Sequence, residues 1–142
     1  MIVAGKNPDI DIIKQYNEKS NGRVLYAGDL NYSLLLSLYK KASTFVHLAY
    51  LDHCPNVVVD AQASGCHVVC SASGGTSEII SDGTVIPDKE WDFNPVKLYD
   101  PPLLDFSNYY VIKKDAFKDI NSTALKYYNV FEQAASHVSK SI

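Results

Sequence analysis

Two aspartates, Asp52 and Asp60, bracket the start of a predicted helix. Pro55 suits the first position of that helix, because its missing N–H would be unpaired there, and Gly65 suits the left-handed position after its end. The helix N-terminus between the aspartates has free N–H groups and the positive end of a dipole, which both favour an anion. Two acceptors beside an anion site suit a ligand that carries phosphate and hydroxyl groups, such as a nucleotide-sugar.

Each of these residues also has a plain structural explanation. Asp52 could be a surface acid or a helix N-cap, and Asp60 could lie on an exposed helix face. His53, a candidate general acid or sugar contact, could be a solvated loop histidine, and His47 in a predicted strand is expected to be structural. Gly74-Gly75 could form an anion-binding nest or only a tight turn. The motifs around these residues therefore have to distinguish the functional from the structural explanation.

Strand-like and helix-like stretches alternate along the first part of the chain. The predicted strands cover residues 2–5, 23–28, 44–48 and 67–71, and the predicted helices cover residues 8–19, 32–42, 55–64 and 76–81. Apolar strands separated by helices indicate right-handed βαβ units, and hence a Rossmann-like doubly wound parallel sheet. Such a sheet binds ligands beyond the carboxyl ends of its strands, where the loops at 50–55 and 73–75 are expected.

The 142 residues predict a single domain, in which the α/β core takes residues 1–83. Residues 84–112 are rich in aromatic residues and proline and predict a loop region, and residues 113–138 predict a C-terminal helical region. The formal net charge of −3 argues against a nucleic-acid partner, and no apolar run is long enough to span a bilayer. The odd count of three cysteines without a signal peptide predicts reduced thiols in the cytoplasm.

Several motifs follow one another in a fixed order. They are Gly28-Asp29-Leu30, Leu38-Tyr39-Lys40-Lys41-Ala42, Asp52 through Gly65, His67-Val68-Val69, and Gly74-Gly75-Thr76-Ser77-Glu78-Ile79-Ile80 with Asp82-Gly83. With this order and spacing, residues 3–83 resemble the C-terminal, donor-binding domain of GT-B fold glycosyltransferases, and more narrowly the group 1 retaining enzymes of glycosyltransferase family 4.

The resemblance implies roles for individual residues. In addition, an anion-binding nest at Gly74-Gly75 would bind the diphosphate. Contacts to the donor sugar are expected from Asp52, His53 and Cys54. Contacts to the diphosphate are expected from Asn56, Val57, Gly74 and Gly75. Contacts to the nucleoside are expected from Leu30 and Asp60. Neither a metal nor another cofactor is expected, and no side chain is an obvious nucleophile.

The chain departs from the family pattern in three respects. Both family glutamates are aspartates here, at Asp52 and Asp60, which shortens the reach of each carboxylate by about 1.5 Å or less. The family's Gly-Arg…Lys-Gly segment, which binds the diphosphate, and the N-terminal acceptor domain are both absent. We therefore expect a fragment or one half of a split enzyme, which has no transferase activity by itself.

The resulting prediction is the donor-binding half of a retaining, hexosyl-type glycosyltransferase that moves a sugar from a nucleotide-diphospho-sugar to an acceptor. Its expected partners are the donor and the missing acceptor domain, and any peripheral membrane contact would come from that missing half. Two alternatives stay open: half of a nucleotide-sugar epimerase, or a non-catalytic module that binds a nucleotide or another protein.

Overall fold

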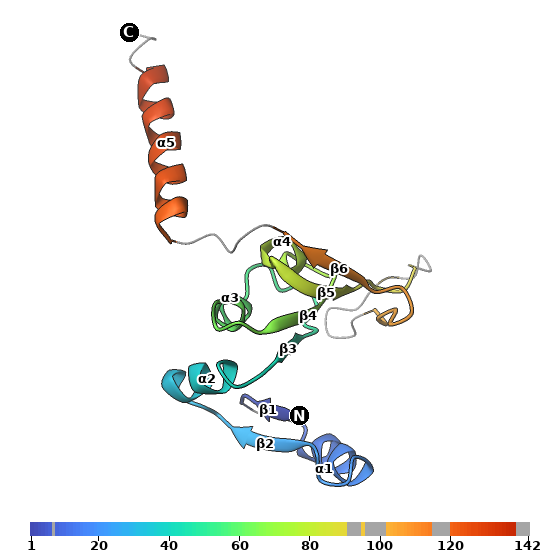
Figure 1. Cartoon of the computed structure of the whole chain (residues 1–142). Coiled ribbons are helices and arrows are strands. Elements are labelled where there is room, and N and C mark those ends of the chain that lie inside the picture. Colours follow the sequence, from blue (N-terminus) through green and yellow to red (C-terminus); the bar gives the residue numbers. More distant parts are fainter. Residues whose placement is uncertain (7, 91–94, 96–101, 115–119, 139–142) are drawn as a thin grey trace.

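A computed structural model describes residues 1–6, 8–90, 95, 102–114 and 120–138 of the chain, and Figure 1 shows its strands in two sheets. The two-stranded sheet consists of β1 (Ile2–Ala4) and β2 (Leu25–Gly28), paired in parallel. The four-stranded sheet has the order β3 (Thr44–His47), β4 (His67–Ser71), β5 (Asp82–Ile86) and β6 (Tyr110–Lys113). In the second sheet β3, β4 and β5 are parallel and β6 is antiparallel, so this sheet is mostly parallel with one reversed edge strand.

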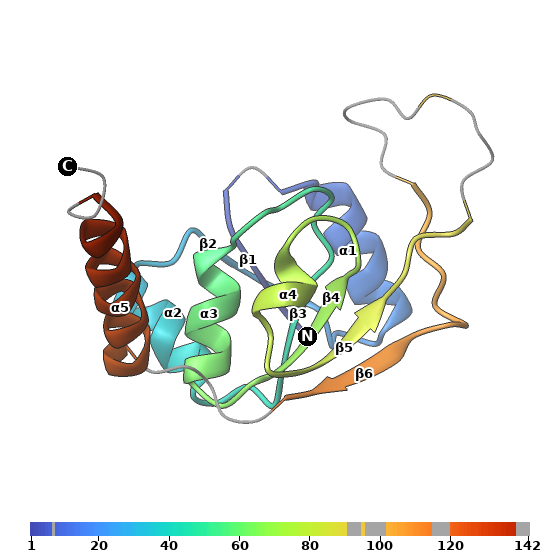
Figure 2. The same cartoon turned by 90° about the horizontal axis from the view of Figure 1, so that it is seen from above.

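The first two helices begin at residues whose side chains cap them. The described helices are α1 (Ile10–Lys19), α2 (Tyr32–Tyr39), α3 (Asn56–Ala63), α4 (Thr76–Ile79) and α5 (Ile120–Val138). Asp9 accepts two backbone N–H groups at the start of α1, and the Asn31 side chain accepts the Leu34 N–H at 3.0 Å at the start of α2. Figures 1 and 2 show α3 and α4 beside the four-stranded sheet, where both contact β4. The Rossmann-like α/β fold is thus confirmed.

The largest difference from the sequence prediction lies after residue 83. We expected a loop over residues 84–112, yet β5 runs through Thr84 to Ile86 and β6 lies at Tyr110–Lys113. Gly83, at the predicted end of the α/β core, pairs with Val68 on one side and with Ile112 on the other. The predicted aromatic loop around residues 91–101 lies mostly outside the described residues.

The C-terminal helix also differs from its prediction. Among the described residues it covers Ile120–Val138, and Lys113, at the predicted start of the helical region, belongs to β6 instead. Figures 1 and 2 show α5 set apart from the sheets, and its apolar side chains are exposed: Ile120 by 82% and Phe131 by 67%. In the part of the chain that the structure describes, no helix is both long enough and apolar enough to cross a membrane.

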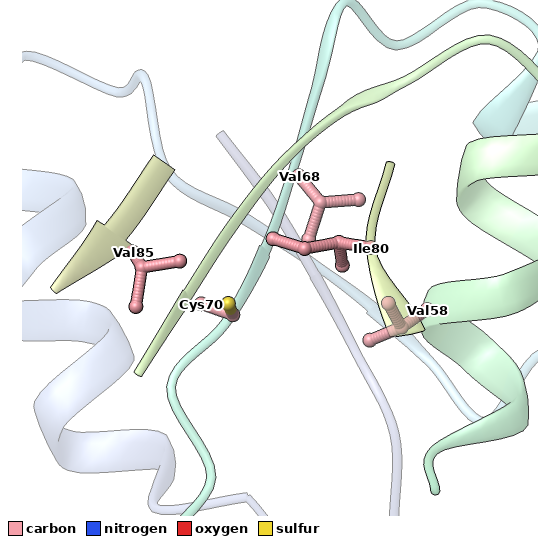
Figure 3. Packing of buried hydrophobic residues seen from close by; sticks show 5 residues of the cluster. All are labelled: Val58, Val68, Cys70, Ile80 and Val85. Carbon is pink, nitrogen blue, oxygen red and sulfur yellow. The ribbon is translucent and has the colours of Figure 1, made fainter. Parts of the chain in front are cut away.

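The main hydrophobic core lies between the four-stranded sheet and the helices α3 and α4. Figure 3 shows its five buried side chains, which are at most 1% exposed: Val58, Val68, Cys70, Ile80 and Val85. A second cluster consists of Tyr39, Ala61 and Cys66, with the Tyr39 ring meeting Phe45 edge-on at 5.2 Å. Residues of α3 occur in both clusters, so this helix is anchored on the sheet side and on the α2 side.

The three cysteines are all free, but only Cys54 is exposed. Burial raises the pKa of the Cys66 thiol, and it raises the pKa of Cys70 to about 11. The reactive thiolate of Cys70 is then only about one part in a thousand at pH 8, and it increases as the pH rises toward 11.

We therefore predict that iodoacetamide at pH 8 labels Cys54 quickly and the other two thiols only after unfolding in denaturant. Cys54→Ser should abolish the fast phase and leave the slow one unchanged. Mass spectrometry of the labelled protein measures both phases. Rapid labelling of Cys66 or Cys70 in the native protein would contradict the burial described above.

Candidate functional site

Two loops at the carboxyl ends of neighbouring strands are hydrogen-bonded to each other. The loop after β3 carries Asp52, His53 and Cys54, and the loop after β4 carries Gly74 and Gly75. The Gly75 N–H donates to the Asp52 carbonyl oxygen at 3.0 Å, and the Thr76 hydroxyl donates to the same oxygen at 3.4 Å. The fold therefore brings the predicted sugar-contacting loop and the glycine loop together at one edge of the sheet.

Both glycines are explained by this close packing. A Cβ on Gly74 would lie 2.5 Å from the Asp52 carbonyl oxygen, and one on Gly75 would overlap the carbonyl oxygen of His53. Gly74 also has a left-handed φ of +78°, whereas the φ of Gly75 is −91°, which any residue can adopt. Because the Gly75 N–H already donates to Asp52, that amide is engaged within the protein. The diphosphate role of the two glycines stays a prediction.

Helix α3 begins one residue later than the sequence suggested. Pro55 is its N-cap, with an extended ψ of 112°, rather than its first helical residue, and it makes no side-chain capping bond. Asn56 and Val57 are consequently the first two helical residues, whose N–H groups find no acceptor within the helix. Gly65 follows the helix with a φ of +92°, as predicted from its sequence position.

The Asp52 side chain does not cap this helix. Its Oδ2 lies 3.1 Å from Nε2 of His47, the last residue of β3, in a half-buried pair whose side chains are 36% and 16% exposed, respectively. The His47 ring also stacks on Phe45, with ring centroids 6.2 Å apart. From the sequence His47 was expected to be structural, and its contact with Asp52 was not predicted. The available signal was its position at the carboxyl end of a strand, where candidate site residues gather.

Asp60 lies in the second turn of α3 and is half-buried. It shares one side of the helix with Val57, three residues earlier, while Val58 and Ala61 face the protein interior. Burial raises the pKa of the Tyr39 phenol, and the negative charge of Asp60 raises it further. Asp60 therefore lies beside the end of α2 rather than on a fully solvated face.

The remaining predicted residues lie on the surface or on the other sheet. His53 and Cys54 are exposed in the loop before α3. Leu30 is half-buried and follows β2 of the two-stranded sheet, so the sheet that holds Asp52 does not position it. Among the described residues, no group of three or more potential metal ligands is found.

Gln62, on α3, is hydrogen-bonded to the segment after α4, a contact that the sequence did not predict. Its Oε1 accepts hydrogen bonds from the Ser81 N–H at 2.6 Å and from the Ser81 hydroxyl at 3.1 Å. Its Nε2 donates to the Ile79 carbonyl oxygen at 3.4 Å. These contacts fix the ends of α3 and α4 relative to each other, which stabilises the orientation of the α3 N-terminus.

A small cavity of about 90 Å³ lies beyond the carboxyl ends of β3, β4 and β5. In its lining, the Ser73 hydroxyl donates to the Asp88 carboxylate. The distance from Ser73 Oγ is 2.7 Å to Asp88 Oδ2 and 2.9 Å to Oδ1. Its lining consists of Leu48, Tyr50, Ser71, Ser73, Asp88, Pro102 and Leu104. None of the predicted site residues lines this cavity, which is too small for a whole nucleotide-sugar.

A mostly parallel sheet with loops joined at its carboxyl edge and a helix starting there defines an α/β domain of the Rossmann-like class. The sequence model of the family described as Glycosyl transferases group 1 matches residues 1–92. The chain therefore belongs to the group 1 glycosyltransferases. The comparison with curated proteins and the comparison with solved structures gave no match.

Proposed function

We propose that this chain binds a nucleotide-diphospho-sugar and serves as the donor-binding half of a retaining, hexosyl-type glycosyltransferase. The observation that carries the proposal is the hydrogen-bonded junction of Asp52 with Gly75 beside the start of α3. It brings a carboxylate, a helix N-terminus and a tightly packed glycine loop to the edge of the sheet where such domains bind ligands. Membership of the group 1 glycosyltransferases supports sugar transfer in general.

Different residues would contact different parts of the donor. The Asp52 carboxylate would accept hydrogen bonds from sugar hydroxyls, and the backbone of His53 and Cys54 would make further hydrogen bonds with those hydroxyls. The N–H groups of Asn56 and Val57 would face the diphosphate, whose negative charge grows as the bond from the sugar to the phosphate oxygen breaks. This is electrostatic stabilisation of the leaving group, and it requires no metal or other cofactor.

Two further residues would hold the nucleoside. Asp60 would accept hydrogen bonds from the ribose hydroxyls, and Leu30 would pack against the base. Because Asp60 lies on the same side of α3 as Val57, one helix can contact both the phosphate and the ribose. The acceptor would be held by a second domain, so we expect this chain to bind the donor without turning it over.

Isothermal titration calorimetry with UDP, GDP and their sugars tests the proposal. In the wild-type protein we expect binding of one donor type. Asp60→Ala should weaken it by roughly 10- to 150-fold, since a hydrogen bond to a charged group contributes about 1.5–3 kcal/mol. Asp11→Ala is the matched control, because that carboxylate is almost fully exposed on α1 and should leave the affinity unchanged.

The same titrations test donor binding against the alternative of a non-catalytic interaction module. Equal binding by the wild type and the Asp60→Ala variant would contradict the proposed site. Failure of every nucleotide and nucleotide-sugar to bind would contradict donor binding and favour the non-catalytic interaction module. Turnover of donor and acceptor by this chain alone would contradict the proposed need for a second domain.

A further inference from the structure

We propose that His47 is a positioning residue that orients the Asp52 carboxylate toward the donor sugar. This inference rests on the proposed donor site. Its evidence is the 3.1 Å contact between His47 Nε2 and Asp52 Oδ2, in which the histidine is 84% buried. The contact joins the last residue of β3 to the loop that follows it, at the edge of the sheet where the glycine loop and the start of α3 also lie.

The chemistry of the pair fixes the proton. An ionised carboxylate only accepts hydrogen bonds, so Nε2 of His47 has to carry the hydrogen. One carboxylate oxygen, Oδ2, is thereby held. Among the described residues no donor occupies Oδ1 of Asp52, and this oxygen is left for a sugar hydroxyl.

The histidine itself is held in place by packing. Its ring lies nearly parallel to the Phe45 ring, at an interplanar angle of 17°, and Phe45 in turn meets the buried ring of Tyr39 edge-on. On the other side, the Asp52 carbonyl oxygen accepts the Gly75 N–H at 3.0 Å. Both the main chain and the carboxylate of Asp52 are therefore fixed before any ligand binds. Such preorganisation lowers the entropic cost of binding.

A short carboxylate makes this orientation matter more. An aspartate reaches less far than a glutamate, and a hydrogen bond tolerates only a narrow range of donor–acceptor distances. A freely rotating Asp52 would present its oxygen to the sugar only part of the time. With Oδ2 held by His47, Oδ1 keeps one direction. This fixed direction offsets part of the affinity that the shorter aspartate side chain would lose.

The test compares donor binding with binding of the nucleotide alone. UDP-glucose with UDP, and GDP-mannose with GDP, are titrated into the wild type, His47→Phe and His47→Gln. Phenylalanine keeps the stack on Phe45 and removes the donor, whereas glutamine restores an N–H donor of similar reach. We expect His47→Phe to weaken the sugar-linked donor about tenfold and the plain nucleotide less than twofold, with His47→Gln recovering most of the loss. Adding His47→Phe to Asp52→Ala should cause no further loss.

A readout that needs no ligand covers the case in which His47→Phe fails to fold. Nitrogen NMR of the wild type should show the hydrogen of His47 on Nε2, and Asp52→Ala should change that signal. A His47 whose hydrogen resides on Nδ1 would overturn the inference.

The outcomes separate this inference from the proposed function. Donor affinity that is unchanged in His47→Phe would overturn the positioning role and leave the donor site standing. Equal weakening of the nucleotide and the sugar-linked donor would assign His47 a structural role only, which also overturns the inference. No binding of any of the four probes by the wild type would refute the donor site, and the positioning role with it.

Discussion

Replacing Gly75 by alanine should lower the free energy of unfolding by about 3 kcal/mol or more, because the new methyl group would overlap the carbonyl oxygen of His53. The obstacle is main chain and not the end of a flexible side chain, so the loop before α3 would have to move. That movement would also break the 3.0 Å hydrogen bond from the Gly75 N–H to Asp52. Urea denaturation followed by circular dichroism measures the loss.

Gly65→Ala is the control for this substitution. Gly65 has a φ of +92°, which strains an alanine, but a Cβ there meets nothing within 4 Å. Its expected cost is therefore only the conformational strain, about 1–2 kcal/mol. Gly75 has an ordinary φ, so a glycine is required there only because a Cβ would have no room beside the His53 carbonyl oxygen. An equal loss in the two variants, or a Gly75→Ala variant as stable as the wild type, would contradict the packing of the two loops.

The sequence predicted the elements whose signals are local. Asn31 accepts the Leu34 N–H at the start of α2, as expected of a cap residue, and Gly65 has the left-handed φ expected after α3. The strand at His67–Ser71 was predicted with its observed bounds. Such positions depend on a few neighbouring residues, so no knowledge of the rest of the fold is needed.

The elements that were missed depend on distant partners. β6 becomes a strand because Tyr110 pairs with Val85 and Ile112 with Gly83, which lie 25 and 29 residues earlier in the chain. Nothing near Tyr110 in the sequence announces that partner. The single sheet expected from the alternation of elements is also divided, since the β1–β2 pair is hydrogen-bonded separately from the other four strands. Which strands become neighbours is a property of the whole chain.

In the candidate site, too, the features with local sequence signals were predicted and those that depend on distant residues were not. The sequence indicated the loop of Asp52 and the start of α3, because aspartates around a helix N-terminus form a recognisable pattern. It did not reveal that His47 contacts Asp52, that Gly75 packs on His53, or that Gln62 bonds to Ser81. Those contacts depend on side-chain direction and on the close approach of two loops, which spacing alone does not encode.

Truncating Ile80 should cause the other large loss of stability. Its side chain is 1% exposed and belongs to the main core cluster, together with Val58 of α3 and Val68 of β4 (Figure 3). Ile80→Ala removes buried methyl and methylene groups and leaves a cavity, at a cost of about 3–5 kcal/mol. Ile80→Val should cost only about 0.5–1.5 kcal/mol, which keeps the measurement possible if the alanine variant is largely unfolded.

Ile12→Ala makes the same chemical change on a side chain that is 53% exposed on α1, so its effect should stay within about 0.5 kcal/mol. A loss at Ile12 as large as the loss at Ile80 would contradict the location of the core. The comparison also bears on the site, because the cluster anchors α3 through Val58, two residues after the helix begins. A cavity at Ile80 should therefore loosen the helix whose first N–H groups are proposed to face the diphosphate. In the folded Ile80→Val variant, we expect a small loss of donor affinity that affects the nucleotide and the sugar-linked donor alike, unlike the selective loss expected for His47→Phe.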